Sequence, residues 1–90
     1  MNNHENLTRL IRENRLAEAA VQTDMQLASC HDDSYLWYIR GKIWWKMGNR
    51  AQAMTCYSRA VAIDPASPAA SALEQAHDIA DFFNPDLLNP

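Results

Sequence analysis

One stretch, residues 34–65, constrains the fold more than any other part of the chain, because it has the pattern of two short helices joined by a tight turn. Gly48 and Asn49 are turn-forming residues and separate two segments with helical spacing of apolar residues. Each segment carries large and small side chains on one face, namely Trp37, Gly41 and Trp44 in the first and Ala53, Tyr57 and Ala60 in the second. A glycine inside a helix costs about 1 kcal/mol relative to alanine. We therefore expect Gly41 to let another backbone come close in a helix hairpin.

The spacing of these residues resembles the tetratricopeptide repeat, whose signature is Trp-x2-Leu-Gly-x2-Tyr, then Ala-x3-Phe, then Pro. The matching positions in this chain are Trp37, Gly41, Trp44, Ala53, Tyr57, Ala60 and Pro65. One position departs, because Arg40 stands where the family has leucine. We expect Arg40 to have a structural role, either with its charged end in water or paired with an acid such as Glu18 or Asp24.

The segment before this hairpin has the pattern of a second, weaker hairpin. Apolar residues recur at helical spacing on both sides of a short polar break, at Leu7, Leu10, Ile11, Leu16, Ala19, Ala20, Met25 and Leu27. Asn14 can adopt the left-handed conformation that ends a helix. It precedes Ala19 by the same interval by which Gly48 precedes Ala53, and the two pairs are offset by about 34 residues, the period of this repeat. Thr23 replaces the aromatic residue of the second unit, so the first unit is divergent.

The end of the chain has the pattern of a single further helix. Pro65 ends the second hairpin, Ser67 and Pro68 are suited to begin a new helix, and Asn84-Pro85 ends it. The predicted fold is all-α, a right-handed α-α superhelix of two helix hairpins plus a C-terminal capping helix, five helices in total. It forms a single domain over residues 1–90, divided into a divergent first repeat (1–33), a well-matched second repeat (34–67), a capping helix (68–84) and an apolar tail (85–90).

The resemblance also implies a binding surface. In the family, the first helices of successive hairpins line a concave groove that holds an extended peptide or a partner helix. The matching groove positions are Tyr35, Tyr38, Lys42, Trp45 and Lys46 in the second unit and His4, Thr8 and Arg12 in the first. Tyrosine and tryptophan provide large contact areas with few rotatable bonds, as binding hot spots require. Alternatively, Tyr38 and Trp45 only pack against the neighbouring first and fifth helices, and the sequence leaves both possibilities open.

The charges favour a particular kind of ligand. Between Ser34 and Ala60 the chain has no acidic residue and five basic ones, Arg40, Lys42, Lys46, Arg50 and Arg59. Lys42 and Lys46 lie one turn apart on the expected groove face, so an acidic segment or a C-terminal carboxylate would gain charge-assisted hydrogen bonds there. The alternative is that these cations pair with acids on the flanking helices, namely Glu5, Glu13, Glu74, Asp78 and Asp81.

Composition and the remaining residues argue against several other classes of function. The net charge of -3 and a pI near 5.4 disfavour a nucleic-acid partner, which requires a basic surface. The N-terminus is too polar for a secretory signal and no run approaches a membrane span, so we expect a cytoplasmic protein without a membrane partner, with Cys30 and Cys56 reduced. The histidines and cysteines form no catalytic or metal-ligand motif. We expect no catalytic residue, no cofactor and no metal.

The sequence therefore predicts a non-catalytic protein–protein interaction module. It would bind a peptide segment or partner helix in the concave groove, with an acidic or C-terminal segment as a candidate ligand, and would be a monomer capped by its fifth helix. The alternative is a self-assembling structural module that forms a homodimer through its groove or open end. That contact would use the C-terminal helix and the tail, with Phe82, Phe83, Leu87 and Leu88. A third possibility is that the tail folds back into its own groove until a partner displaces it.

Overall fold

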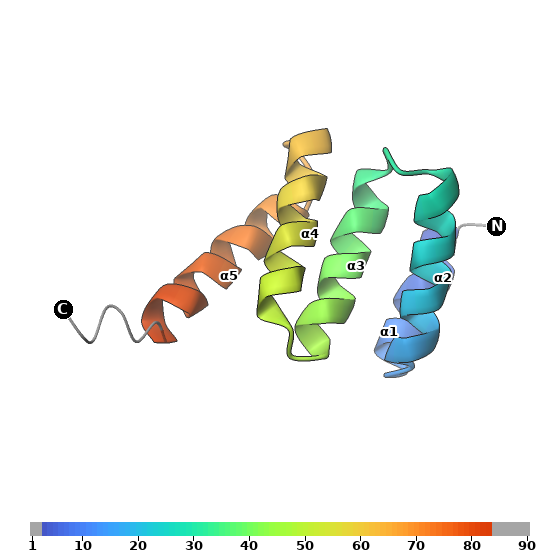
Figure 1. Cartoon of the computed structure of the whole chain (residues 1–90), viewed down its shortest axis with the longest axis horizontal. Coiled ribbons are helices and arrows are strands. Elements are labelled where there is room, and N and C mark those ends of the chain that lie inside the picture. The colour runs from blue at the N-terminus through green and yellow to red at the C-terminus, as the bar shows by residue number, and fades with distance from the viewer. Residues whose placement is uncertain (1–2, 84–90) are drawn as a thin grey trace.

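The computed structural model describes the backbone of residues 3–83 and the side chains of residues 4–76. Over this range the chain forms five helices and no strand, as Figure 1 shows: α1 Asn3–Arg12, α2 Leu16–Ser29, α3 Ser34–Lys46, α4 Arg50–Ile63 and α5 Ala69–Phe83. The predicted all-α architecture of two helix hairpins and a fifth helix is confirmed. The tail (residues 85–90) and the side chains of Phe82 and Phe83 lie outside the described residues.

Both hairpins turn through a residue in the left-handed conformation. The backbone φ is 62° at Asn14, between α1 and α2, and 87° at Gly48, between α3 and α4. This conformation ends a helix, and glycine and asparagine adopt it at the lowest cost. Ala19 lies five residues after Asn14 and Ala53 lies five residues after Gly48, and both alanines are completely buried. The first hairpin therefore has the same turn conformation and the same small contact residue as the second, at equivalent positions, as the offset of about 34 residues predicts.

Short polar side chains cap the N-terminal ends of α3 and α4. The Asp33 carboxylate accepts hydrogen bonds from the backbone N–H groups of Tyr35 and Leu36, at 3.0 and 3.3 Å, and so caps α3. The Asn49 side chain accepts from the Gln52 N–H at 3.1 Å and caps α4. Each cap satisfies amide groups that have no partner within the helix, which contributes about 1 kcal/mol.

The connection between α4 and α5 follows the predicted signals. Helix α4 ends at Ile63, just before Asp64 and Pro65, because proline has no N–H to continue the helical hydrogen bonds. The Ser67 hydroxyl then accepts a hydrogen bond from the Ala69 N–H at 3.1 Å. Helix α5 accordingly begins at Ala69, one residue later than the start of the predicted capping helix.

The deepest packing involves α3 residues that the sequence analysis did not single out. Leu36, Ile39 and Ile43 are almost completely buried and form one core cluster with residues of the first hairpin, namely Leu7, Leu10, Ile11, Ala19 and Leu27. Met25, which shares the helical spacing of α2, points outward instead and is 67% exposed. Helix α3 thus attaches the first hairpin to the second.

A second cluster lies on the other side of α3 and depends on Gly41. It contains Ala53, Tyr57, Ala60 and Ala69, with Trp37 and Trp44 partly buried against it. A Cβ atom on Gly41 would lie 2.5 Å from Cε1 of Tyr57 and 3.2 Å from the carbonyl oxygen of Ala53. The close approach predicted at Gly41 is therefore confirmed, and the group that approaches most closely is the ring of Tyr57.

Arg40 connects α2, α3 and α4. Its Nε donates to Oδ1 of Asp24 at 2.8 Å, and one terminal nitrogen lies 3.3 Å from the Sγ of Cys56. Burial alone would lower the pKa of Arg40, but the hydrogen bonds to Asp24 and Cys56 outweigh it and the pKa is raised. The guanidinium carbon also lies 5.9 and 5.8 Å from the ring centres of Trp37 and Trp44. The predicted pairing with an acid on α2 is confirmed for Asp24.

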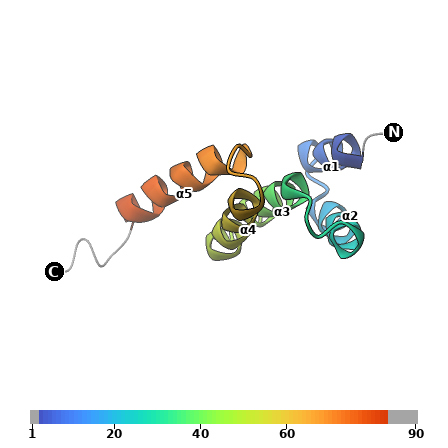
Figure 2. The same ribbon diagram turned by 90° about the horizontal axis from the view of Figure 1, so that it is seen from above.

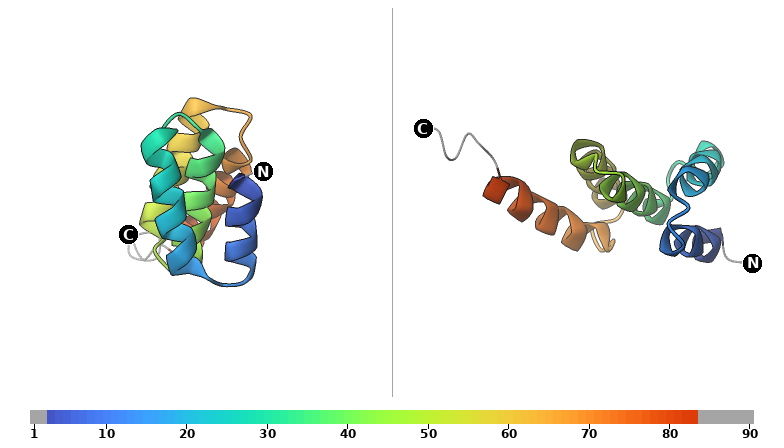
Figure 3. Two further views of the ribbon diagram at one scale, coloured as in Figure 1. Left: turned by 90° about the vertical axis from the view of Figure 1, so that its right-hand side faces the viewer. Right: turned by 90° about the horizontal axis from the view of Figure 1, so that it is seen from below.

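The helices are arranged so that one side of the array is concave. Seen from above, α1 and α5 flank α3 on one side, while α2 and α4 lie on the opposite side (Figure 2). The end-on view agrees, because α1 and α5, which lie at opposite ends of the array, project to one side and α2 to the other (Figure 3). Helix α3 packs against α1, α2 and α4, and α5 packs against α4.

Replacing Gly41 by alanine tests the close contact in the second cluster. The added Cβ would overlap the ring of Tyr57, and overpacking of this kind costs about 1 to 3 kcal/mol. Alanine's higher helix propensity offsets about 1 kcal/mol. We predict that Gly41→Ala lowers the free energy of unfolding by up to about 2 kcal/mol in urea denaturation. In a Tyr57→Leu background most of this loss should vanish; an unchanged loss would show that the ring is not the obstacle.

Candidate functional site

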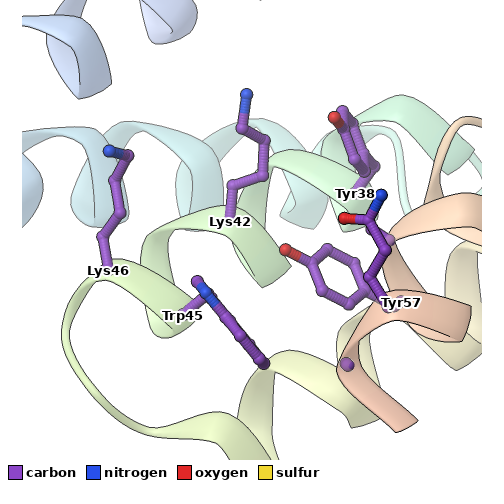
Figure 4. Close-up of a pocket in the computed structure, with 8 residues that line it drawn as sticks. Tyr38, Lys42, Trp45, Lys46 and Tyr57 are labelled. Atoms are coloured by element: carbon purple, nitrogen blue, oxygen red, sulfur yellow. The ribbon is translucent and has the colours of Figure 1, made fainter. Parts of the chain in front are cut away.

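The concave side holds a pocket between α3 and α5, which we call the α3–α5 pocket. Its volume is about 300 Å³. Helix α3 contributes Tyr38, Lys42, Trp45 and Lys46, and α4 contributes Tyr57 (Figure 4). Helix α5 completes the lining with Ala72, Gln75 and Ala76.

Aromatic rings form the deep part of this pocket. The ring of Tyr57 is 4% exposed, and its centre lies 6.0 Å from that of Tyr38. Burial, together with the neighbouring Tyr38 and Cys56, raises the pKa of Tyr57 to about 12. Burial and the neighbouring Tyr35 also raise the pKa of Tyr38. Both phenols are therefore neutral at physiological pH and can donate a hydrogen bond to a ligand.

Two lysines stand at the rim of the pocket. Figure 4 shows the side chains of Lys42 and Lys46 pointing in the same direction, away from the rings of Trp45 and Tyr57 beneath them. The Lys42 ammonium group lies 5.5 Å from the ring centre of Tyr38. Within the described residues neither lysine makes an ion pair. They are also the only lysines in the chain.

The other cations of the basic segment are held by rings or by an acid on α2. Arg50 lies 5.1 Å from the ring centre of Trp45, and Arg59 lies 5.1 Å from that of Trp37. Among the residues whose side chains are described, no cation of the basic segment forms an ion pair with Glu5, Glu13 or Glu74, and Glu13 pairs with Arg15 instead. The side chains of Asp78 and Asp81 lie outside that range.

A second hollow, of about 400 Å³, lies beside α1 and is called here the α1 pocket. It is lined by His4, Glu5, Thr8, Arg12 and Tyr35. The His4 Nε2 lies 3.0 Å from Oδ2 of Asp33, and the His4 and Tyr35 ring centres are 4.5 Å apart. These contacts attach the start of α1 to the start of α3. The Thr8 hydroxyl donates to the His4 carbonyl at 2.8 Å.

The eight predicted groove residues thus all lie on the concave side, divided between two pockets. The α3–α5 pocket takes four of them and the α1 pocket takes the other four. The rings of Tyr38 and Trp45 are each partly buried against the second cluster and also line the pocket, and their role in binding stays a prediction.

Sequence reasoning missed the contribution of α5 and assigned Tyr57 only a packing role. Ala72 and Ala76 follow Tyr38 and Lys42 by one repeat period of about 34 residues, so the period itself could have found them. Glu5 and Gln75, which occupy no matching groove position, carried no such signal.

Residues 34–67 match the family model of the tetratricopeptide repeat. The match places a repeat of this family in the chain where the residue spacing predicts it, over helices α3 and α4. Repeats of this family are in general non-catalytic modules for protein–protein interaction. Comparisons with curated proteins and with solved structures gave no match. None of the helices in residues 3–83 is long and apolar enough to cross a membrane.

The raised pKa of Tyr57 predicts a loss of stability at alkaline pH. The pKa is about 12 in the folded chain, above the ordinary value of 10.0, so the neutral phenol is the form that the fold favours. This contribution is fully present below pH 10 and is lost as the pH rises toward 12. We expect Tyr57→Phe to show a smaller decrease in the thermal midpoint between pH 10 and 12, followed by circular dichroism. Equal decreases in the two proteins would contradict the burial of the phenol.

Proposed function

We propose that this chain is a non-catalytic interaction module that binds an acidic segment of a partner protein along its concave face. The observation that carries the proposal is the pair of lysines at the rim of the α3–α5 pocket. Lys42 and Lys46 have no acidic partner within the described residues, and they stand beside the aromatic rings of Tyr38 and Trp45. A carboxylate bound there would form charge-assisted hydrogen bonds, which are stronger than those between neutral groups.

The charge of the concave face supports an acidic ligand although the whole chain is negative. Arg12 lies in the last turn of α1 and Lys46 in the last turn of α3. Both side chains line the concave pockets. The positive charge is therefore local, and its effect on association should weaken as salt screens it. We infer that residues 1–33, with their matching turn and buried alanine, act as a divergent first repeat that extends this surface.

The alternative of homodimerisation depends largely on residues that are not described. It assigns the contact to the end of α5 and to the tail, including Leu87 and Leu88. No observation within residues 3–83 favours it, and it stays a prediction of the sequence. The monomeric state and the cytoplasmic location likewise stay predictions.

Reversing the lysine charges tests the proposal. The probe is a fluorescent heptapeptide with blocked ends, Gly-Asp-Asp-Leu-Asp-Asp-Gly, called the leucine probe. We predict that Lys42→Glu and Lys46→Glu each weaken its binding about tenfold in fluorescence anisotropy, because a charged hydrogen bond is replaced by repulsion.

The matched control is Arg59→Glu, which makes the same change in net charge on α4 at a position that lines neither pocket. It should leave the affinity nearly unchanged. A probe with asparagine in place of aspartate should bind weakly to every variant. Equal losses in the lysine variants and the control, or no binding of the leucine probe at all, would contradict the proposed function.

A further inference from the structure

We propose that the α3–α5 pocket holds one apolar side chain of the bound segment, next to the acidic side chain that contacts Lys42 and Lys46. The inference rests on the proposed function and deepens it. The expected ligand is therefore not defined by charge alone. It carries an apolar residue of about the size of leucine or phenylalanine next to an acidic residue.

The depth of the pocket comes from the contact between Gly41 and Tyr57. Because Gly41 has no side chain, the Tyr57 ring lies directly against α3, where a Cβ would be only 2.5 Å away. The ring then lies between Tyr38 and Trp45, as Figure 4 shows, and because Tyr57 is only 4% exposed it forms the floor of the pocket. An aromatic floor with aromatic walls favours burial of a nonpolar group.

The width of the pocket comes from two small residues on α5. Ala72 and Ala76 face the pocket at the positions where α3, one repeat period earlier, carries the large side chains of Tyr38 and Lys42. Larger residues there would fill the space. The volume of about 300 Å³ corresponds to about ten water molecules at liquid density, which one large apolar side chain can displace in part.

The charged groups lie at the edge of this space, and one phenol hydroxyl lies inside it. Lys42 and Lys46 stand at the rim, Gln75 of the lining is exposed, and in Figure 4 the Tyr57 hydroxyl points into the pocket. Within the described residues the Tyr57 hydroxyl makes no hydrogen bond. Every fully buried side-chain oxygen or nitrogen among these residues has a hydrogen-bond partner, so the Tyr57 hydroxyl must be reached by solvent. A ligand with an apolar side chain inside and a carboxylate outside matches this distribution of polar and nonpolar atoms.

A double-mutant cycle between the pocket and the ligand tests the inference. The two ligands are the leucine probe and an alanine probe, Gly-Asp-Asp-Ala-Asp-Asp-Gly, and the two proteins are the unmodified chain and Ala72→Leu, which fills the pocket from α5. We predict that the unmodified chain binds the leucine probe about tenfold more tightly than the alanine probe. In Ala72→Leu the two probes should bind equally, at about the affinity of the alanine probe.

The control is Ser71→Leu, which adds the same side chain at the neighbouring exposed position of α5. It should keep the tenfold preference. If Ala72→Leu also keeps the preference, the apolar side chain binds elsewhere and the inference is wrong, while losses in Lys42→Glu and Lys46→Glu would still support the proposed function. If no probe binds the unmodified chain, the proposed function fails first.

A second measurement does not depend on the folding of any variant. Nuclear Overhauser contacts between the leucine methyl groups of the bound probe and the unmodified chain should reach the rings of Tyr57 and Trp45. Contacts of these methyl groups with Tyr35 and Thr8 in the α1 pocket, or with neither pocket, would overturn the inference.

Discussion

The close packing of Tyr57 against Gly41 is the contact on which the second hairpin, the attachment of α5 and the α3–α5 pocket depend. It brings α4 against α3, and with Ala53 and Ala60 it forms the cluster on which Ala69 of α5 packs. The same ring is the floor of the α3–α5 pocket. One glycine, which is unfavourable in an isolated helix, therefore provides both the stability of the second hairpin and the depth of the candidate site. A side chain at position 41 would disturb both.

Much of this arrangement could be predicted from local chemistry. Asn14, Gly48 and Pro65 mark turns and ends because their backbone preferences are strong and independent of context. The buried residues of α3 could not be ranked in this way. Apolar side chains surround that helix, so periodicity does not show that Leu36 and Ile43 are buried more deeply than the tryptophans.

The candidate site was predictable in its α1 and α3 residues and incomplete elsewhere. The positions of Lys42 and Trp45 followed from the family resemblance, but the pocket exists because α5 carries alanines opposite them. The repeat period gives the positions of Ala72 and Ala76, but the space that these small side chains leave opposite α3 becomes visible only when the helices are placed together. The sequence also did not show which cations of the basic segment are paired with an acid and which are not. Arg40 is paired with Asp24, whereas Lys42 and Lys46 have no acid partner in the described residues.

If the concave face binds a partner segment as proposed, it is open in the free chain and becomes covered when the segment binds. Lysine acetylation followed by mass spectrometry tests it directly, because Lys42 and Lys46 are the only lysines and both lie within residues 41–50, between two arginine cleavage sites. We predict that both lysines are acetylated in the free chain and that both are protected when the leucine probe is bound. Protection of both lysines in the free chain at every dilution would show that the concave face is already covered and would contradict the proposed function.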